Sequence, residues 1–539
     1  MQQATFGPTD AEVLRLMQLG YSAWIDEQLA LPISFNHAQA TRALAAQLPS
    51  NAEWFSRPGV WDLNDTLWRG LMGPDQLRQR LMFALSQIFV ISIKDGSVYY
   101  LISGAAAFAD LLAEKGTGNF RELLEGVTRS TAMGGFLGHL YNRKENPATG
   151  ARPDQNFARE LMQLFSIGLW QLNPDGTFKT DSQGQRLPTY GQADIEGVSR
   201  VMTGWGFDAS TNAHWNGGSG AMFLSARDMP VQERPMRAFP AYHSTLEKRF
   251  LGVTIPATAS PDPVGNLQLL LDTLFNHPNT GPFIARRLIQ RLVSSNPSRG
   301  YVGRVAAAFA NNGNGVRGDM KAVVKAILLD PEARDPALAA WPLYGRLREP
   351  IQRMLQVMRV FKAQPESNPN SFGISMWLYD KRKGLWQTPF AAPSVFNFFM
   401  PNHTPPRSAL SSRQLVAPEM QITTQSSVDD IQWFFSDMLQ NGGLTECCSD
   451  ALRNTYRLRL DYSEWLPLVA DPPRLANRLS EVFCAGQLSA EARAVLVDAI
   501  NAVNTNRSPT SGMVRGVPQL KLANALHHLL LTPEYIVQK

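Results

Sequence analysis

The sequence predicts a mainly α-helical, multi-helix globular protein with a small β-hairpin excursion and an irregular covering segment. Apolar residues recur with the 3.6-residue period of an amphipathic helix along most of the chain. The best strand signal is Asp175-Gly176 between two short extended runs, a pair that is typical of a tight hairpin turn. Residues 377–406 are rich in aromatic residues, two of them tryptophan, and in proline, and they include a glycine, so they predict the irregular covering segment.

Length and composition bound the domain organisation. The chain has 539 residues, which is enough for two or more domains or for one large helical body with an appendix. Hydrophobic residues make up 44% of the chain and charged residues 18%, as in an ordinary globular protein. We expect a helical core over residues 1–410 and a C-terminal helical region, residues 411–539, that packs on this core.

Charge and hydropathy patterns argue against two classes of partner. The net charge of +5 is spread along the chain, and no basic run is longer than Lys381-Arg382-Lys383. The sequence therefore predicts no nucleic-acid binding. The longest apolar stretch, residues 81–93, is interrupted by two serines and a glutamine, and it is too short to span a membrane. The segment after Met1 shows no signal peptide.

The cysteines and histidines predict neither a disulfide framework nor a metal centre. The three cysteines are Cys447, Cys448 and Cys484. A bond from either of the first two to Cys484 stays open, and free packed thiols are the favoured alternative. No C-x-x-C pair or H-E-x-x-H spacing is present, so we expect no bound metal. No phosphate-binding loop or dinucleotide fingerprint is present either, so no cofactor is predicted.

The first helices follow from caps and apolar stripes. Pro8 and Thr9 open a helix over residues 10–31. Its apolar side is expected to consist of Val13, Leu14, Leu16, Met17 and Tyr21. Residues 75–94 are predicted to form a core helix, and Arg80 and Gln87 lie close enough to its apolar stripe to be drawn inward.

The remaining helices alternate with short turns. Asn119 and Asp319 are typical N-caps of the helices that follow them. Further helices are expected over residues 120–128, 192–202, 266–275, 278–294, 300–311, 320–329 and 346–362, and again after residue 414.

Residues 139–169 hold the densest clustering of polar residues beside a strong apolar stripe. Pro153 and Gly168 suit the start and the end of a helix. Between them a buried stripe is expected from Phe157, Leu161, Leu164 and Phe165. Asn156, Glu160 and Gln163 share an adjacent face, with Arg159 next to them. A polar loop leads into this helix and contains Asn142, Arg143, Lys144 and Asn146. The pattern predicts a polar site built onto a core helix.

This asparagine-rich loop, the Ala158-Arg159-Glu160-Leu161 run and the later Thr203-Gly204-Trp205 resemble the signature of a bacterial family called domain of unknown function 1800. The resemblance extends from residues 3–9 to residues 531–535, which is nearly the whole chain. It implies no established activity. Relatives usually carry an export leader, which implies a periplasmic or secreted protein. Relatives are also commonly encoded beside a secreted sulfatase-like protein, which implies a protein partner.

The first candidate site combines the polar loop with the helix that follows it. Its members are Asn142, Arg143, Asn146, Asn156, Arg159 and Glu160. A carboxylate beside a guanidinium normally has a lowered pKa, which suits a ligand-binding role better than that of a general acid. The alternative is a buried ion-pair network that ties the loop to the helix. We expect Glu160 to meet Arg143 or Asn142, because adjacent residues on a helix diverge by about 100°.

Two histidines and an arginine form the other candidates. The resemblance implies a His-Asp-Gly-Lys run at His243, but Ser244 replaces the aspartate and the glycine is absent. A histidine bonded to the backbone is the alternative there. His277 precedes a helix that Asn279 or Thr280 could cap, and whose first turns suit an anion. Arg286, two turns inside this helix, would bind that anion.

Two weaker patterns complete the set. The loop over residues 311–319 has alternating oxygen ligands and glycines, which is typical of a calcium loop, but the closing glutamate is missing. A simple turn is the favoured alternative. A sugar-stacking surface or core packing would explain four tryptophans, namely Trp205, Trp215, Trp377 and Trp386.

Two functional classes follow from these candidates. In the first, the chain is an exported protein that acts on or binds an envelope polymer or polysaccharide, with Glu160, His243 or His277 as acid/base groups. In the second, it is a non-catalytic binding or assembly partner of a secreted sulfatase-like protein. Whether the chain is an enzyme stays open at this point. An open cleft around Glu160 would favour the enzyme, and an exposed apolar face elsewhere would favour the partner.

Overall fold

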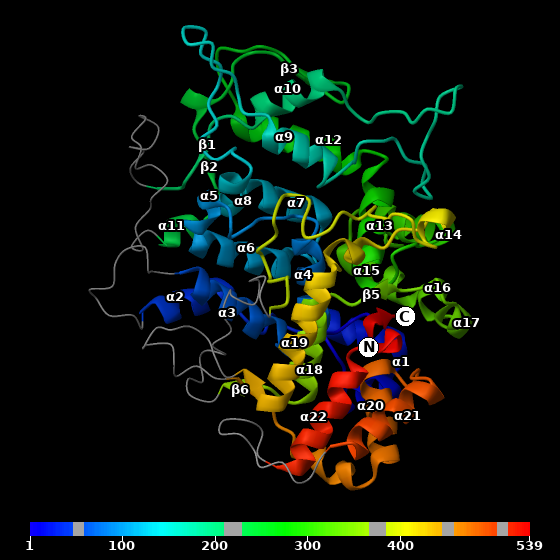
Figure 1. The fold of residues 1–539 in the computed structure, drawn as a ribbon. Helices are drawn as coiled ribbons and strands as arrows, with labels where there is room; N and C mark the ends of the chain where they lie inside the picture. The colour runs from blue at the N-terminus through cyan, green and yellow to red at the C-terminus, as the bar shows by residue number, and fades with distance from the viewer. Residues whose placement is uncertain (47–58, 210–228, 366–383, 445–457, 504–515) are drawn as a thin grey trace.

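Helices dominate the computed structural model, which describes residues 1–46, 59–209, 229–365, 384–444, 458–503 and 516–539. Over these residues the strands form only short antiparallel pairs, and the helices stack in several layers along the long direction of the molecule (Figure 1). The mainly α-helical class with small hairpins is confirmed. In the part of the chain that the structure describes, no helix combines the length and the apolar character that a membrane crossing needs.

The N-terminal helices build the centre of the core. Their bounds are α1 Asp10–Ala30, α2 His37–Ala46, α3 Val60–Leu71, α4 Gln76–Ser86, α5 Gly96–Tyr99, α6 Ile102–Lys115, α7 Phe120–Arg129 and α8 Thr131–Phe136. Every residue of α4 from position 76 to position 85 is buried, and Arg80 and Gln87 point inward as predicted. The predicted helix over 75–94 is too long, however. Residues after Gln87 leave the helix, and the Ser92 hydroxyl and the Ile93 N–H donate to carbonyls of residues 392 and 390.

The predicted apolar side of α1 is wrong for Leu14, Met17 and Tyr21, which are exposed, whereas Leu16 packs partly buried against the core. Leu14 is 58% exposed and Met17 is 75% exposed, whereas the buried residues of this helix are Trp24, Ile25 and Leu29. The reason is a break at Gly20, whose φ of 75° is non-helical. The stripe before the break therefore does not continue onto the face that packs after it.

The middle of the chain forms the polar end of the molecule and the layer beneath it. The elements are α9 Asn156–Gln163, α10 Gln192–Val201, β1 Trp205–Gly206, α11 Met229–Glu233, β2 Arg237–Ala238, the 3-10 helix η4 Pro240–Tyr242, β3 Lys248–Phe250, β4 Val253–Ile255, α12 Pro263–Asn276, α13 Thr280–Leu292, α14 Arg299–Ala310 and α15 Met320–Leu329. β1 pairs with β2, and β3 pairs with β4.

The organising helix α9 is shorter than predicted. It begins at Asn156 rather than at Pro153, because the Asp154 carboxylate accepts the Asn156 N–H at 2.8 Å and holds a turn there. Its stripe is buried as predicted through Phe157, Leu161 and Phe165. The hairpin that follows is confirmed at Asp175-Gly176, where the Gly176 N–H donates to the Asn173 carbonyl at 2.9 Å.

The C-terminal elements complete the same core. They are α16 Pro331–Arg334, α17 Pro336–Ala340, β5 Arg346–Leu347, α18 Pro350–Val360, β6 Gln364–Pro365, η6 Ser411–Arg413, η7 Pro418–Ile422, α19 Gln425–Asn441, β7 Gly443–Leu444, β8 Leu458–Arg459, η8 Leu466–Ala470, α20 Pro472–Cys484, α21 Ala490–Asn501, α22 Val517–Leu529, α23 Pro533–Ile536 and β9 Val537–Gln538. One continuous apolar cluster runs from Ala4 to Tyr535. The proposed division at residue 410 stays a prediction.

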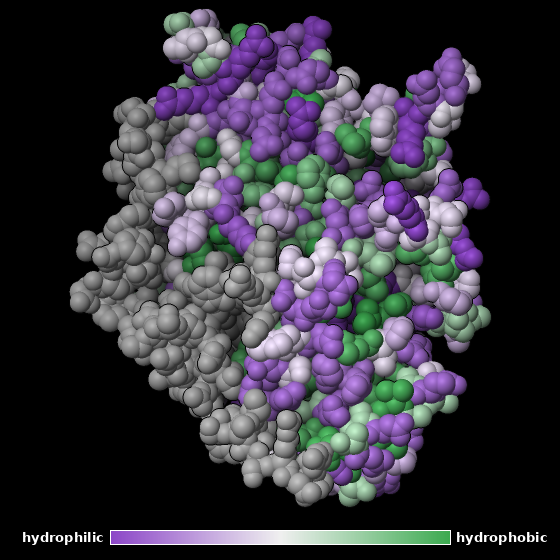
Figure 2. Space-filling view, in the orientation of Figure 1, coloured by the Kyte–Doolittle hydropathy of each residue, from purple (hydrophilic) through white to green (hydrophobic). Residues whose placement is uncertain are grey.

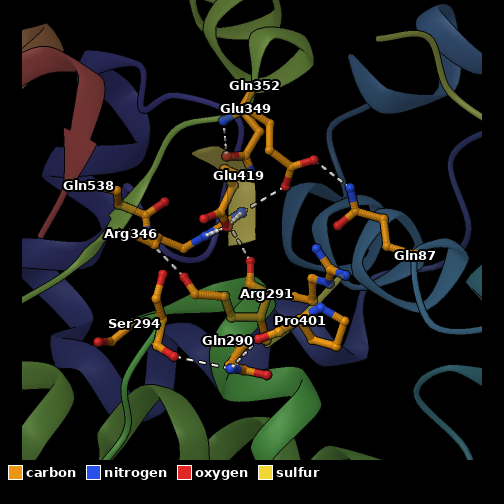
Figure 3. A network of polar contacts seen from close by, with 12 residues as sticks. Gln87, Gln290, Arg291, Ser294, Arg346, Glu349, Gln352, Pro401, Glu419 and Gln538 are labelled. Atoms are coloured by element: carbon orange, nitrogen blue, oxygen red, sulfur yellow. Dashed lines mark hydrogen bonds and ion pairs between the residues drawn. The ribbon is translucent and has the colours of Figure 1, made fainter. Parts of the chain in front are cut away.

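The helix predicted over 346–362 begins only at Pro350, because Arg346 and Leu347 pair with β9. This arrangement carries Arg346 into a fully buried ion network (Figure 3). Its guanidinium donates to Glu349 at 2.7 Å and to Glu419 at 2.8 Å. The second Glu349 oxygen accepts from the side-chain amides of Gln87 and Gln387. The network joins α4, α18 and η7 at the middle of the core.

The structure describes only part of the covering segment and one of the three cysteines. Residues 384–406 run without a helix, as predicted, whereas Trp377 lies outside the described residues. Cys484 is a buried free thiol, and its burial raises its pKa to about 12. Cys447 and Cys448 also lie outside the described residues.

Candidate functional site

The polar end of the molecule is formed by α9, α10, β3 and the loop that leads into α9. In Figure 2 hydrophilic residues gather at this end, over the helices and strand that Figure 1 labels there. α9 packs against α10, and α10 packs against β3. Three sequence segments that were singled out separately therefore meet at one end: the polar loop, the Thr203-Gly204-Trp205 run and the segment around His243.

Glu160 is the most unusual group at this end. It lies on α9 with only 5% of its surface exposed. Among the described residues its Oε2 atom has no hydrogen-bond partner. Burial raises the pKa of the carboxyl to about 7, and the charge of Arg159 opposes this rise only in part. The carboxyl is therefore substantially protonated at neutral pH, the opposite of the lowered pKa that the sequence predicted.

The expected partners of Glu160 bind elsewhere. The Asn142 amide accepts the Asp154 N–H at 2.8 Å and donates to the Asp154 carbonyl at 3.2 Å. The Arg143 guanidinium lies 5.7 Å from the centre of the Tyr242 ring. Arg159 is exposed and makes no ion pair within the described part of the chain. The expectation that Glu160 meets Arg143 or Asn142 is wrong, because Asn142 is used to close the loop onto residue 154.

The two other asparagines of the group lie in the loop and at the start of α9. The Asn146 side-chain oxygen accepts the Ala148 N–H at 3.1 Å, and its backbone N–H donates to the Ala151 carbonyl. Asn156 is exposed at the first position of α9. Asn146 thus shapes a turn, while Asn156 and Arg159 present polar side chains to solvent beside Glu160.

His243 is buried and fully hydrogen-bonded. Its Nδ1–H donates to the Thr203 carbonyl at 2.8 Å, and its Nε2 accepts from the Asn266 amide at 2.9 Å. Burial lowers its pKa to about 4, although the bond to Thr203 opposes this. The ring is therefore neutral near pH 7, with both nitrogens engaged. Through these two bonds His243 holds the turn at Thr203 against α12.

Sequence reasoning missed an ion cluster next to His243. Glu145 accepts from Arg200 at 2.8 Å and from the Ser244 hydroxyl at 2.8 Å. The fully buried Lys248 ammonium donates to the Ser244 carbonyl at 2.8 Å. Burial alone would raise the pKa of Glu145, but these hydrogen bonds and the Arg200 charge lower it on balance. Glu145 sits inside the polar loop, so its position among the signature residues was the available signal.

Two aromatic residues were also missed, Tyr190 near Glu160 and Trp170 on the hairpin that follows α9. Tyr190 is half-buried, its hydroxyl lies 3.4 Å from the Gln163 side-chain oxygen, and the Glu160 charge helps to raise its pKa to about 12 after burial. Trp170 is 37% exposed and bridges to Pro188, two residues before Tyr190. No spacing in the sequence links Tyr190 to α9, because the two meet only in the fold. Trp205, by contrast, is a core residue, and Trp386 donates to Asp430.

His277 and Arg286 lie on a different part of the molecule. The His277 Nδ1 accepts the Asn279 N–H at 3.1 Å, and burial lowers its pKa. Asn279 does not cap α13 with its side chain as predicted. Instead its amide donates to the Ile167 and Trp170 carbonyls and accepts the Leu172 N–H, which anchors the hairpin. Arg286 lines a separate cavity beside the hairpin turn.

The loop over residues 311–319 uses its oxygens on its own backbone. The Asn311 side-chain oxygen accepts two N–H groups, from Gly313 and Gly315, and Asn312 accepts two more. Asp319 caps α15 as predicted. Among the residues that the structure describes, no group of three or more His, Cys, Asp or Glu side chains is placed to hold a metal ion.

Comparisons with known proteins give a family and no function. A family model with the description "Protein of unknown function (DUF1800)" matches residues 1–537. No curated protein and no solved structure matches the chain.

Proposed function

Since the chain belongs to the DUF1800 family, whose description names no function, we propose a function from the chemistry around Glu160. The protein binds a hydroxyl-rich envelope polymer, such as a polysaccharide, at the polar end formed by α9, α10 and the loop before α9. This function requires export to the periplasm or beyond, because such polymers lie outside the cytoplasm.

The observation that carries this proposal is the buried carboxyl of Glu160, whose Oε2 atom has no hydrogen-bond partner among the described residues and whose pKa is raised to about 7. A protonated carboxyl donates one hydrogen bond and accepts others, as a sugar hydroxyl does. A buried polar group without a partner is unfavourable by roughly 1–3 kcal/mol. A ligand hydroxyl that supplies the missing partner would offset this cost.

The surroundings of Glu160 suit a carbohydrate. Tyr190 adds a hydroxyl, and Arg159 and Asn156 add exposed donors. On the hairpin that follows α9, Trp170 exposes an aromatic face on which the ring of a further sugar unit can stack. A carboxyl with a pKa near 7 can also act as a general acid. Cleavage of the bound polymer is therefore the catalytic form of the same proposal, with Glu160 as proton donor.

We expect Glu160→Gln to remove the pH dependence of polymer binding. Wild-type protein should bind insoluble cell-wall polysaccharide more tightly at pH 6, where Glu160 is protonated, than at pH 8, where it is ionised. Glutamine keeps a neutral donor at both pH values, so the variant should bind equally at each. Co-sedimentation at the two pH values measures this, and product release measures cleavage. A catalytic role predicts binding without cleavage in the variant.

The stability of Glu160→Gln tests whether the raised pKa of Glu160 is the cause of this pH dependence. The folded-state pKa of Glu160 lies above the ordinary value of 4.5, so the folded protein binds more protons and loses stability as pH rises from about 4.5 through 7. Glu160→Gln should be more stable than wild type at pH 8, by up to about 3 kcal/mol, and no more stable at pH 4.5. Glu145→Gln is the matched control and should destabilise. Binding by neither protein, or an unchanged pH dependence in the variant, would contradict the proposal.

A second candidate function rests on a separate observation. α1 exposes Leu14 and Met17, which lie three residues apart on one helical face. Exposed apolar faces mark protein interaction sites. This face favours the alternative function, in which the chain is a non-catalytic partner of a secreted sulfatase-like protein.

The double replacement Leu14→Glu/Met17→Glu is expected to abolish co-purification with a co-expressed sulfatase-like protein, because two charges cannot be buried in an apolar interface. The matched control is Val495→Glu on α21, where an equally exposed apolar residue stands alone. If the double variant still co-purified with the sulfatase-like protein, this candidate function would be wrong. It would also be wrong if the control variant no longer co-purified with that protein.

A further inference from the structure

The hairpin turn, α13 and α14 enclose a cavity that is separate from the groups around Glu160. Its volume is about 200 Å³. It is lined by Asp175, Gly176, Thr177 and Phe178 of the turn, by Arg286, and by Pro297, Arg299 and Val302. Since one water occupies about 30 Å³ in the liquid, this space suits a small group such as an oxyanion with a few attached carbons. Figure 1 shows α13 and α14 side by side at the right of the view.

Arg286 is the central group of this cavity. Burial lowers the pKa of its guanidinium below the ordinary value. Within the described residues it has no hydrogen bond, ion pair or aromatic contact. Its neighbour Arg287 differs, because it bonds to Gln290 and lies 5.0 Å from the centre of the Phe283 ring. Arg286 is half-buried, and a guanidinium in that position without a protein acceptor is available to bind an anion.

The charge around Arg286 also favours an anion. Arg299 is a second cation on the wall, and it stands at the first position of α14, where the N–H groups of the helix end point outward. Asp175 is the one carboxylate on the wall, and it is engaged by the Thr177 N–H at 3.0 Å and the Thr177 hydroxyl at 2.6 Å. These bonds lower its pKa. Two guanidinium groups against one satisfied carboxylate leave a net charge of about +1.

The turn is fitted closely to α14. Gly176 has a φ of +76°, and a Cβ atom there would lie 2.8 Å from the Val302 side chain. Phe178 forms an apolar wall that is 41% exposed, with the Arg186 guanidinium 3.9 Å from the ring centre. The cavity thus combines two cationic side chains with a closely fitted turn and an apolar side that a carbon skeleton can contact.

We propose that this cavity is an oxyanion-binding site, in which Arg286 holds the carboxylate or phosphate group of a small hydroxylated ligand such as an acidic sugar. The Arg286 guanidinium presents two parallel donors to this group. Arg299 and the start of α14 supply the long-range attraction, and the Thr177 and Phe178 side accommodates the rest of the ligand. This site is independent of Glu160 and of the function proposed for it.

The proposal is tested by isothermal titration of the full chain with inorganic phosphate, glucuronate and glucose. Wild type should bind phosphate or glucuronate, and glucose at least ten-fold more weakly. Binding of phosphate alone would identify a free anion as the ligand, whereas preference for glucuronate would identify an acidic sugar. Arg286→Leu should weaken binding of the anions at least ten-fold, and Arg299→Gln should weaken it less, because Arg299 is exposed.

Thermal unfolding separates lost binding from lost folding. Phosphate or glucuronate should raise the melting temperature of wild type and leave that of Arg286→Leu unchanged, while the unliganded variant melts no lower than wild type. The control is Arg304→Gln, a change on α14, the helix that also carries Arg299. It breaks the ion pair between Arg304 and Asp330 and should keep the anion response. Equal binding by Arg286→Leu and wild type would overturn the proposal. So would equal affinity for glucose, or no response of wild type to either anion at millimolar concentration.

Discussion

Arg346→Met is expected to lower the free energy of unfolding by about 3–5 kcal/mol, since it removes one partner from a buried ion network. The Arg346 side chain is fully buried, as are Glu349 and Glu419 with which it pairs. Its guanidinium also donates to the Arg291 carbonyl near the end of α13. Without it, the two carboxylates stay buried with only amides and more distant arginines to balance them. Urea denaturation at pH 7 measures the loss.

Two further variants test the cause of this loss. Arg346→Met combined with Glu349→Gln and Glu419→Gln removes the uncompensated charges, so it should be less destabilised than the single variant. Arg15→Met breaks an ion pair with Glu27 whose side chains are 51% and 36% exposed, and because solvent screens such a pair it should change stability far less than Arg346→Met. A single Arg346 variant as stable as Arg15→Met would show that the network carries no stability.

Leu161→Ala is expected to lower the free energy of unfolding by roughly 2–5 kcal/mol, because it removes a buried side chain and leaves a cavity. Leu161 lies on α9 with no exposed surface, between Phe157 and Phe165 on the same buried stripe. The buried His139 ring stacks on Phe157 at a centroid distance of 3.7 Å, so the first residue of this stripe is covered by a packed ring. The surroundings therefore have little freedom to collapse into the space.

Thermal and urea unfolding measure this effect, with Leu14→Ala as the matched control. Leu14 lies on a helix but is 58% exposed, so the same chemical change should alter stability by no more than about 0.5 kcal/mol. If Leu161→Ala unfolded at the same urea concentration as Leu14→Ala, the stripe of α9 would not belong to the core.

The sequence predicted the helices well wherever a local cap and an apolar stripe agreed. Met320–Leu329 behind Asp319 is such a case. It failed where a distant contact decides the outcome. Residues 88–93 leave α4 because segment 390–392 offers carbonyl partners, and Arg346 leaves the predicted helix because β9 pairs with it. The hydrophobic periodicity of the sequence predicts neither of these two contacts.

The candidate site shows the same limit. The polar loop and Glu160 were found from their composition, but the partners of Glu160 were expected in the preceding loop, at Arg143 or Asn142. The pKa of Glu160 depends on what covers α9, and Tyr190 and the hairpin that carries Trp170 arrive from residues that show no spacing relation to it. Arg286 was identified as an anion-binding group, whereas the turn that completes its cavity was predicted only as a hairpin.

The pairing of β5 with β9 fixes when the molecule can finish folding. The Gln538 side chain donates to the Leu292 carbonyl, 246 residues earlier, and β9 pairs beside the buried Arg346. Among the described strands, β5 therefore has no partner until residues 537–538 have been synthesised. Contacts of such long range also form slowly. Until then the buried network beside Arg346 is incompletely enclosed, so this part of the core is completed only when segments nearly two hundred residues apart have met.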